Sequence, residues 1–441
     1  MEVPVRHAEV NAVPSGASSR HVELKGVVPL KETWHDVSTD VVLIPVEGGV
    51  TAPRGFRAAG VHAGIKRKRK DVCLIISDRR AAAAGTFTTN QVQAAPLIVT
   101  REHIQDGYAQ GIVVNSGIAN ACTGKEGELD ARRMAEMTAE LVGVKPQDIL
   151  VGSTGIIGER LPMDRLEAGI RAAWSQCDTD GWKDAAEAIL TTDTRTKVGA
   201  FEFEIDGVPV RIGGIAKGSG MIHPNMATML AFITTDAAVE PAYLQEALCR
   251  AVNKSFNMIS VDGDTSTNDM VLVLANGAAG NKPLRAGDPG AAPFENALQS
   301  LCIQLAKEIA RDGEGATKLI EIQVAGARTY EDARTVARTI SRSNLVKTAI
   351  YGEDANWGRI LCAAGYSDAF VDPNRIDVFM GDLQVARGGE PCPFDEEKAS
   401  EILREPEVVI KVDLGVGEHR ATAWTCDLTY DYVKINASYR T

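Results

Sequence analysis

The sequence predicts a layered α/β (α+β) fold, because short runs of apolar, β-branched residues alternate with segments of helical periodicity. Of the 441 residues, 44% are hydrophobic and 24% are charged, close to the averages of globular proteins. This composition excludes disordered, collagen-like and coiled-coil proteins. The length is enough for one large domain or two fused domains with a sizeable core.

The expected strands are short runs bounded by turn signals. One hairpin is especially clear: residues 201–205 alternate apolar and polar, Asp206-Gly207 supplies a two-residue turn, and residues 208–212 alternate again. We expect a two-stranded antiparallel ribbon there. Further strands are expected at 42–46, 73–77, 112–114, 149–151, 229–233, 270–274, 320–324 and 408–412.

The expected helices show apolar residues at spacings of three and four. After Pro293 these residues form one stripe, and Gly313 lies where such a helix should end. Residues 276–293, rich in Pro, Gly and Ala, predict a long surface connection. Further helices are expected at 129–142, 163–174, 241–252 and 330–341.

The charge and the cysteines limit the possible partners. Acidic residues outnumber basic ones, 59 against 47, so we expect neither nucleic acid nor a membrane as a partner. The first 40 residues mix both charges and lack the apolar segment of a secretory signal. Eight scattered cysteines without a C-x-x-C pair are typical of a reducing compartment. We therefore expect a cytoplasmic protein with an N-terminal extension at 1–40 and neither metal nor cofactor.

Common catalytic motifs are absent from the sequence. It contains no phosphate loop, no dinucleotide fingerprint, no H-E-x-x-H and no G-x-S-x-G. Residues 262–269 place carboxylates at alternate positions, as in a calcium loop. However, Thr267 stands where an EF-hand requires glycine, and Val273 where it requires glutamate. We expect a polar turn that leads into the strand at 270.

Residues 217–236 combine a flexible loop with a buried strand. Gly218 and Gly220 permit backbone conformations closed to other residues, and the apolar run 229–233 predicts a core strand. Thr228 stands between the two. In one interpretation its hydroxyl satisfies a local hydrogen bond at a loop-to-strand junction.

In the other interpretation the chain processes itself. If Thr228 attacked the carbonyl group of Ala227, an N-to-O acyl shift and hydrolysis would make Thr228 a new N-terminus. An α-amine, with a pKa of about 7.7–8.0, can then act as the base for the hydroxyl of the same residue. Spacing alone leaves both interpretations open.

A second candidate is the segment 151–158, Val-Gly-Ser-Thr-Gly-Ile-Ile-Gly, which predicts a strand end running into a glycine-rich turn. Such a turn exposes backbone N–H groups and the Thr154 hydroxyl, the donors that an oxyanion hole requires. A helix cap or a phosphate cradle is equally compatible with this segment.

Residues 217–232, Lys-Gly-Ser-Gly-Met-Ile-His-Pro-Asn-Met-Ala-Thr-Met-Leu-Ala-Phe, closely resemble the self-cleavage region of the ornithine acetyltransferase (glutamate N-acetyltransferase) family of arginine biosynthesis. The similarity covers nearly the whole chain from about Gly48. Two places depart from the family pattern: Ile118 replaces a second asparagine, and the segment after Thr194 differs from the usual Phe-Pro-Lys type. Further matching motifs lie at 60–65, 86–90, 114–117, 151–155, 260–269, 312–318, 352–359 and 432–441.

The resemblance implies an α-β-β-α sandwich of the N-terminal-nucleophile-like type with a smaller α/β C-terminal domain. It also implies cleavage between Ala227 and Thr228 into an alpha chain, 41–227 after the extension, and a beta chain, 228–441. Residues 228–320 would complete the catalytic core, and about 321–441 would form the C-terminal domain. Two copies of each chain are expected to assemble.

The resemblance further implies the chemistry. Thr228 would take the acetyl group of N-acetylornithine, release ornithine and pass the acetyl group to glutamate, while Thr154 and Gly155 stabilise the oxyanion. Acetyl-CoA is a possible further substrate. The family's substrate contacts map onto Thr191, Lys217, Thr228, Glu314, Asn436 and Thr441.

Alternatives to this hypothesis remain. Without the resemblance, Lys217 would be interpreted as a solvated loop lysine and Glu314 as a charge at a helix end. An aminopeptidase or amidohydrolase of the same fold would replace glutamate by water. An uncleaved binding protein is disfavoured, because Ala227-Thr228 and Thr154-Gly155 are intact.

Overall fold

The structure is a computed structural model, which describes residues 41–223 and 229–438. The expected N-terminal extension and three predicted site residues, Ala227, Thr228 and Thr441, lie outside the described residues. Within the described ranges, no helix is long and apolar enough to cross a lipid bilayer.

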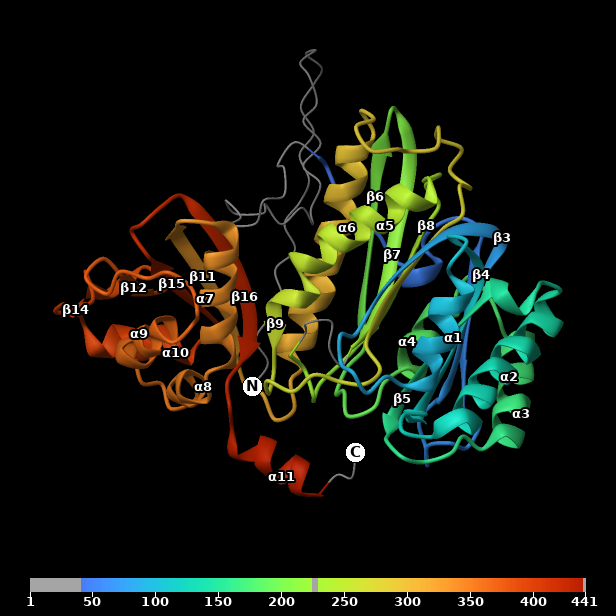
Figure 1. Ribbon diagram of the computed structural model, residues 1–441, viewed down its shortest axis with the longest axis horizontal. Coiled ribbons are helices and arrows are strands. Elements are labelled where there is room, and N and C mark those ends of the chain that lie inside the picture. Colours follow the sequence, from blue (N-terminus) through green and yellow to red (C-terminus); the bar gives the residue numbers. More distant parts are fainter. Residues whose placement is uncertain (1–40, 224–228, 439–441) are drawn as a thin grey trace, which may run out of the picture. The chain divides into compact units, whose positions relative to one another are not determined.

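The larger of two sheets has nine strands in the described part of the chain (Figure 1). Their order is β1-β6-β7-β8-β10-β3-β4-β5, and β2 pairs with β3 beside this path. Strand β8 is parallel to β10 and antiparallel to β7. The strands are β1 (Ile44–Pro45), β2 (Phe56–Val61), β3 (Val72–Phe87), β4 (Tyr108–Ile118), β5 (Ile149–Ile156), β6 (Lys197–Ile205), β7 (Val208–Lys217), β8 (Leu230–Thr235) and β10 (Met270–Ala275).

The long strand β3 takes part in two layers of this folded sheet. Its residues 72–77 pair with β2, whereas residues 82–87 pair with β10. The two layers meet between β5 and β8, since a Cβ placed on Gly152 would lie 3.4 Å from the ring of Phe232. Apolar side chains fill the space between the layers, among them Cys73, Ile75, Ile112, Leu150, Leu230, Phe232 and Leu272.

Helices cover the outer faces of both layers, because each helix has one apolar side. On one face α1, α2 and α3 pack against β3 and β5, and on the other α5 and α6 pack against β3, β6 and β7. The α-β-β-α sandwich implied by the resemblance is therefore confirmed. These helices are α1 (Ala95–His103), α2 (Gly124–Val142), α3 (Met163–Ser175), α5 (Pro241–Asn253) and α6 (Ala291–Arg311), and the short α4 (Trp182–Ala188) contacts β2.

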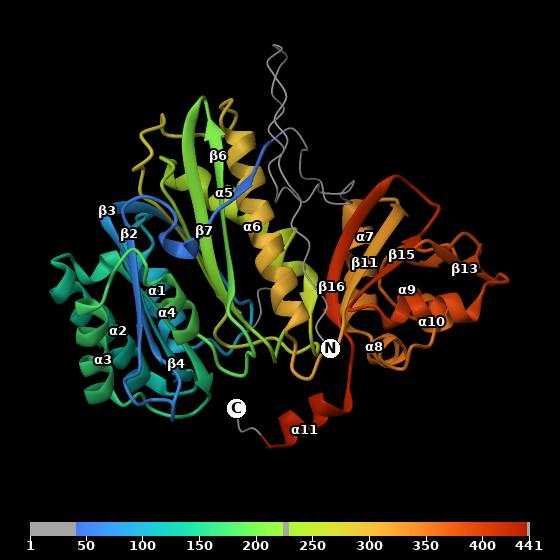
Figure 2. The same cartoon turned by 180° about the vertical axis from the view of Figure 1, so that it is seen from behind.

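The second sheet has seven strands in the described residues, in the order β14-β13-β12-β15-β11-β16-β9 (Figure 2). Strand β9 comes from the segment between α5 and β10 and pairs with β16. The sheet thus joins the sandwich to the C-terminal part of the chain. Its strands are β9 (Ile259–Ser260), β11 (Leu319–Ala327), β12 (Asp377–Met380), β13 (Leu383–Arg387), β14 (Glu390–Pro391), β15 (Glu407–Asp413) and β16 (His419–Cys426), and the remaining helices are α7 (Tyr330–Arg342), α8 (Asn344–Tyr351), α9 (Trp357–Gly365), α10 (Glu396–Arg404) and α11 (Tyr430–Ser438).

Most predicted elements are present. The expected hairpin is β6–β7, and Asp206 and Gly207 take the positive φ angles, 50° and 77°, that a tight two-residue turn needs. The predicted helices lie within α2, α3, α5, α6 and α7. The strand expected at 42–46 is confined to Ile44–Pro45.

The turn predicted within 151–158 begins later than expected. Strand β5 continues through Thr154 and Gly155 to Ile156, so the proposed oxyanion donors lie on a strand. Gly155 pairs with Gly117 of β4 at φ +133°, and a Cβ on Gly155 would lie 2.2 Å from the carbonyl carbon of Gly117. Two facing glycines therefore let the strand continue where bulkier residues would have ended it.

Phe232→Ala should lower the free energy of unfolding by about 3–5 kcal/mol, because it empties a buried site between the two sheet layers. Chemical denaturation followed by circular dichroism measures this change. Leu129→Ala, at a position of α2 that is 58% exposed, is the control and should change it by less than about 0.5 kcal/mol. Equal effects of the two variants would contradict the two-layer core.

Candidate active site

One cavity of about 220 Å³ brings together residues from distant parts of the sequence. Six of the predicted site residues line it: Thr154, Gly155, Thr191, Lys217, Glu314 and Asn436. They come from β5, the segment before β6, the end of β7, the segment after α6, and α11. The other three, Ala227, Thr228 and Thr441, lie outside the described residues.

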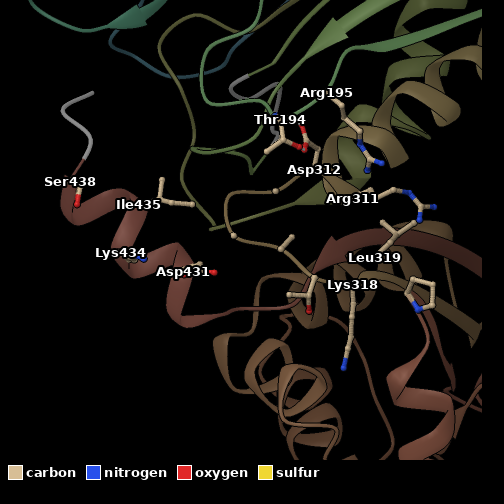
Figure 3. Close-up of a pocket in the computed structure, with 15 residues that line it drawn as sticks. Thr194, Arg195, Arg311, Asp312, Lys318, Leu319, Asp431, Lys434, Ile435 and Ser438 are labelled. Carbon is tan, nitrogen blue, oxygen red and sulfur yellow. Dashed lines mark hydrogen bonds between the residues drawn. The ribbon is translucent and has the colours of Figure 1, made fainter.

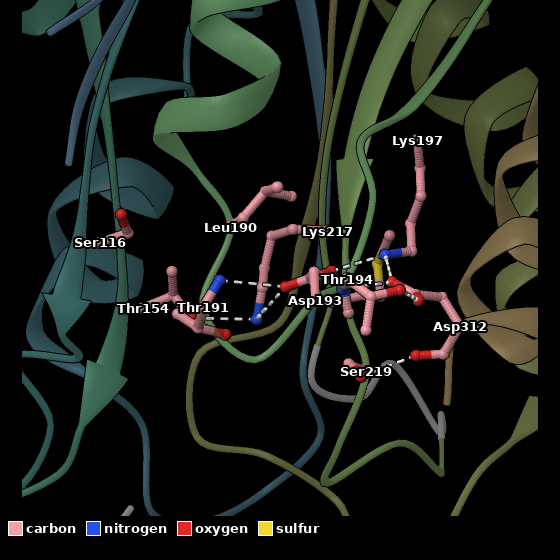
Figure 4. A network of polar contacts seen from close by, with 12 residues as sticks. Ser116, Thr154, Leu190, Thr191, Asp193, Thr194, Lys197, Lys217, Ser219 and Asp312 are labelled. Atoms are coloured by element: carbon pink, nitrogen blue, oxygen red, sulfur yellow. Dashed lines mark hydrogen bonds and ion pairs between the residues drawn. The ribbon is translucent and has the colours of Figure 1, made fainter. Parts of the chain in front are cut away.

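Lys217 is the last residue of β7 and is only 3% exposed, so it is not a solvated loop lysine. Its Nζ donates to the Thr154 hydroxyl at 3.4 Å and lies 4.0 Å from Asp193 Oδ2 (Figure 4). Burial lowers the pKa of the Lys217 ammonium, while Asp193 opposes this effect. A buried cation therefore lies next to the hydroxyl proposed for the oxyanion hole.

Asp193, which the sequence analysis missed, fixes the residues around Lys217. Its Oδ1 accepts hydrogen bonds from Lys197 Nζ and the Gly218 N–H, both at 2.7 Å, and its Oδ2 accepts one from the Thr191 N–H at 3.0 Å. Burial alone would raise the pKa of Asp193, but the Lys217 and Lys197 ammonium groups hold it well below its usual range. Asp193 is therefore a carboxylate at neutral pH.

Lys197 joins Asp193 to a second carboxylate. Its Nζ donates to Asp312 Oδ2 at 2.6 Å, and its side chain is fully buried. Asp312 also accepts hydrogen bonds from the backbone N–H and the hydroxyl of Thr194, while its own carbonyl oxygen accepts one from the Ser219 hydroxyl at 2.7 Å. We call Asp193, Lys197 and Asp312 the buried triad. It ties the segments at 191–197, 218–219 and 312–314 to one another.

Glu314 lies two residues after Asp312 in the sequence and lines one side of the cavity. Its backbone N–H donates to the carbonyl oxygen of Ser219 at 3.0 Å. A Cβ on Gly220 would lie 2.4 Å from the Glu314 carboxyl carbon, so a side chain at position 220 would displace this carboxylate. Asn436 Nδ2, on α11, donates to Glu314 Oε2 at 2.8 Å. Glu314 thus presents its carboxylate to the cavity, as an acceptor for a cationic amine.

Both described ends of the predicted cleavage segment are anchored. Before it, the Asp262 carboxylate accepts the Met221 and Ile222 N–H groups at 2.6 and 2.8 Å. After it, the Met229 N–H donates to Asp269 Oδ1 at 2.8 Å. The polar turn expected at 262–269 is present and leads into β10, so its carboxylates bind backbone amides of this segment.

His223 holds the end of this segment with both ring nitrogens. Arg338 donates to Nε2 at 3.3 Å, so Nδ1 carries the proton and donates to the Ser260 hydroxyl at 3.1 Å. Burial and then the positive charges of Arg338 and Arg342 lower the pKa of His223 to about 4. The ring is therefore neutral near pH 7.

A larger cavity of about 750 Å³ is lined by none of the predicted site residues (Figure 3). Asp431 and Lys434 of α11 lie on one side of it and Arg195 and Arg311 on the other. Arg311 is already paired with Glu308 and Glu407. The larger cavity is lined by neither Thr154 nor Gly155 and by none of the predicted substrate contacts, so the smaller cavity is the candidate active site.

The sequence matches a known family over most of its length: the family model described as "ArgJ family" covers residues 57–441. The chain belongs to the ArgJ family. The resemblance found in the sequence is therefore confirmed.

Relatives in this family align with the chain over nearly their whole length. The "Arginine biosynthesis bifunctional protein ArgJ" of Symbiobacterium thermophilum is 60% identical over 397 residues, 89% of this chain and 99% of that protein. The protein of the same name from Caldanaerobacter subterraneus is 52% identical over 400 residues, 90% of this chain and 99% of that protein.

Two solved structures are also similar in sequence. The Bacillus halodurans "Arginine biosynthesis bifunctional protein argJ" is 53% identical, with a TM-score of 0.47, and the match covers 47% of this chain and 98% of that one. The Mycobacterium tuberculosis "Ornithine Acetyltransferase complexed with Ornithine" is 40% identical, with a TM-score of 0.39, and the match covers 42% of this ArgJ-family chain and 98% of that one.

Lys197→Met should lower the free energy of unfolding by about 3–5 kcal/mol, because it leaves two buried carboxylates without their shared cation. Chemical denaturation measures the loss. Arg133→Ala removes an exposed arginine paired with Glu136 and Glu140 at 3.3 Å, and should cost less than about 1 kcal/mol. A small effect at Lys197 would show that the triad does not hold the three segments.

Stability should fall as the pH drops from about 6.5 toward 4, and His223→Gln should reduce this loss by up to about 3 kcal/mol. The unfolded chain takes up a proton near the ordinary pKa of histidine, whereas the folded chain resists it until about pH 4. Protonation therefore favours unfolding in this window. Denaturation curves at pH 4.5, 5.5 and 7.5 measure the effect, and parallel losses in both proteins would contradict it.

Proposed function

We propose that this ArgJ-family chain cleaves itself between Ala227 and Thr228 and then transfers the acetyl group of N2-acetyl-L-ornithine to L-glutamate. The observation that carries the proposal is the single cavity lined by Thr154, Gly155 and four predicted substrate contacts. These residues come from five separate segments, so their convergence supports a common role. The ArgJ relatives named for arginine biosynthesis support the pathway.

In the cleavage step, the Thr228 hydroxyl oxygen attacks the Ala227 carbonyl carbon, and the C–N bond breaks as the hydroxyl proton moves to the leaving nitrogen. Water then hydrolyses the resulting ester. Chains of 227 and 214 residues result. The pairing of β7 with β8 and the Lys197–Asp312 contact cross the cut, which supports continued association of the two chains.

In the transfer step, the Thr228 oxygen attacks the acetyl carbonyl of N-acetylornithine, and its own α-amine accepts the hydroxyl proton. The Thr154 hydroxyl and the Gly155 N–H donate to the oxyanion. Ornithine leaves with that proton, and the glutamate amine then attacks the acetyl ester and restores the free hydroxyl. Lys217 pairs with the α-carboxylate of either amino acid, and Glu314 attracts the second amine of ornithine.

The described cysteines are all free thiols, which supports a reducing compartment such as the cytoplasm. An assembly of two copies of each chain belongs to the same proposal. The relatives are named "bifunctional", and a second activity with acetyl-CoA as the acetyl donor is part of the same proposal. Supplying acetyl-CoA as the sole donor with glutamate tests this part separately.

Wild-type protein should run as two fragments on denaturing electrophoresis, and the second should begin at Thr228, whereas Thr228→Ala should remain one chain without activity. Ser15→Ala, in the N-terminal extension, is the control that should cleave normally. Edman sequencing and intact mass identify the new terminus. A single wild-type band would sink the mechanism.

Assays with N-acetylornithine and labelled acetyl groups separate transfer from hydrolysis. Acetylglutamate should form only when glutamate is present, and Lys217→Met should reduce kcat/KM at least about 100-fold because it removes the cation for the α-carboxylate. Release of free acetate at equal rates with and without glutamate would instead support the amidohydrolase.

A further inference from the structure

The sequence contains a run of five consecutive basic residues at 66–70, Lys-Arg-Lys-Arg-Lys, that the proposed chemistry does not use. It is the longest run of lysine and arginine in a chain whose net charge is −12. The run lies in the segment 62–71, which connects β2 to β3 and which we call the basic loop. A dense positive charge in an acidic protein points to an anionic ligand.

A buried carboxylate holds the basic loop in place. Asp71 is fully buried, and its two oxygens accept the backbone N–H groups of residues 63, 65 and 66 at 2.6, 2.8 and 2.9 Å. Three charge-assisted hydrogen bonds to one side chain fix the backbone of this half of the loop. The basic side chains therefore project from a defined position.

Two of the basic side chains fasten the loop to the wall of the candidate active site. Lys66 Nζ donates to the carbonyl oxygen of Leu190 at 2.8 Å, and the Arg69 guanidinium donates to that of Asp193 at 3.0 Å. Leu190 and Asp193 flank Thr191, one of the predicted substrate contacts (Figure 4). The basic loop thus contacts the segment that lines the cavity.

The basic loop also lies against the strand that pairs with the proposed oxyanion donors. A Cβ on Gly117 would lie 3.0 Å from Lys66 Cγ, and Gly117 is paired with Gly155 across β4 and β5. Burial lowers the pKa of the Lys66 ammonium to about 8, and the positive charges of Arg69 and Lys217 contribute to this shift. The charge of Lys66 is therefore felt inside the candidate active site.

Arg67 and Lys68 are the members of the run that are left for a ligand. Both are exposed, and neither has an ion pair or a side-chain hydrogen bond within the part of the chain that the structure describes. Lys70, by contrast, is paired with Asp184 and Glu187. The outer part of the basic loop thus presents two neighbouring cations to solvent beside the candidate active site.

The surroundings of the cavity indicate which anion these cations bind. In the proposed function Lys217 already pairs with the α-carboxylate of the amino-acid substrates. Acetyl-CoA, the proposed second donor, carries its acetyl group and its phosphates at opposite ends of a long uncharged arm. The cavity of about 220 Å³ is smaller than the about 300–1,000 Å³ of a usual ligand pocket, so most of this donor must lie outside it. Arginine and lysine are the usual partners of phosphate.

We propose that Arg67 and Lys68 bind the phosphate groups of acetyl-CoA while its acetyl group lies at Thr154 and Gly155. This inference rests on the proposed function, of which acetyl-CoA as a second donor is a part. The basic loop offsets the repulsion between the phosphates and the carboxylates that line the cavity. These carboxylates belong to Asp262, Asp264 and Glu314.

The larger cavity fits the phosphates less well, although basic residues line it too. Arg195 and Arg311, two of these residues, are both paired with Glu308. Asp312 and Asp431 also line this cavity and would repel an anion. The basic loop has no such carboxylate next to Arg67 and Lys68 in the sequence, where both neighbours are basic.

The double substitution Arg67→Gln with Lys68→Gln is the test, because it removes both unpaired charges and keeps the contacts of Lys66 and Arg69. Titration calorimetry with CoA on the full chain measures binding without cleavage or transfer. The Kd for CoA should rise at least about tenfold, whereas the Kd for pantetheine, which lacks the phosphates, should stay within about twofold. Added salt should weaken CoA binding more in the wild type than in the variant.

Lys282→Gln with Lys398→Gln is the matched control. Both lysines are exposed, and they lie neither in the basic loop nor in the wall of the cavity. The control removes the same amount of charge, so it separates a local contact from the effect of net charge. Its Kd for CoA should stay within about twofold of the wild-type value.

Three outcomes would overturn the proposal: an unchanged Kd for CoA in the loop variant, an equal loss in the control, or an equal loss for pantetheine. Tight, loop-dependent binding of inorganic pyrophosphate or of an oligonucleotide by a wild-type chain that does not bind CoA would overturn it as well. Each of these outcomes would assign the loop to a different ligand or to none.

If the loop variant does not fold, the wild-type enzyme decides. Inorganic pyrophosphate should then compete with acetyl-CoA as the acetyl donor but not with N-acetylornithine, because only acetyl-CoA carries phosphates. Inhibition of both reactions alike, or of neither, would overturn the proposal. A wild-type chain that neither cleaves itself nor transfers acetyl from N-acetylornithine would instead refute the proposed function.

Discussion

The buried Lys197 ammonium is the contact on which the candidate active site depends. It lies between two carboxylates, Asp193 and Asp312, that are far apart in the sequence. Each carboxylate uses its remaining acceptor positions on backbone N–H groups of the cavity wall, at Thr191, Thr194 and Gly218. Buried charges are tolerated only when they are paired and fully hydrogen-bonded. One lysine therefore fixes the positions of three backbone segments and, through them, of the substrate contacts.

The remaining residues of the candidate site lie at or next to the ends of strands. Lys217 ends β7, and the antiparallel pairing of β7 with β8 sets it opposite Leu230, close to where β8 begins. Asp269 lies at the start of the parallel neighbour β10, and Thr154 near the end of β5. The folding of one long sheet into two layers, with Phe232 packed on Gly152, brings these ends to a common edge. Packing between the two layers thus determines which side chains come together at this edge.

The sequence was enough to predict the layered fold, the β6–β7 hairpin and six of the residues that line the cavity. Hydrophobic periodicity predicts which side of a helix or strand is buried, and the motifs of the family indicate which side chains belong to the active site. Neither reveals a buried charge whose partners are distant in the sequence. Lys197 lies in a segment that departs from the family pattern, and Asp312 lies in a motif in which only Glu314 has a predicted role. The extension of β5 through Gly155 was missed because it depends on a second glycine, Gly117, on another strand.

The pairing of β7 with β8 has a consequence for how the mature enzyme persists. In the uncut chain a connection of 12 residues brings two adjacent strands of the sheet together, so their association is intramolecular and its entropic cost is small. After the proposed cut, the same backbone hydrogen bonds join two molecules, and reassembly from unfolded chains depends on concentration. If the chain is cut as proposed, only the uncut precursor reaches this structure by a unimolecular route. The lifetime of the cut protein would then be governed by its rate of unfolding, as in other proteins whose persistence is kinetic.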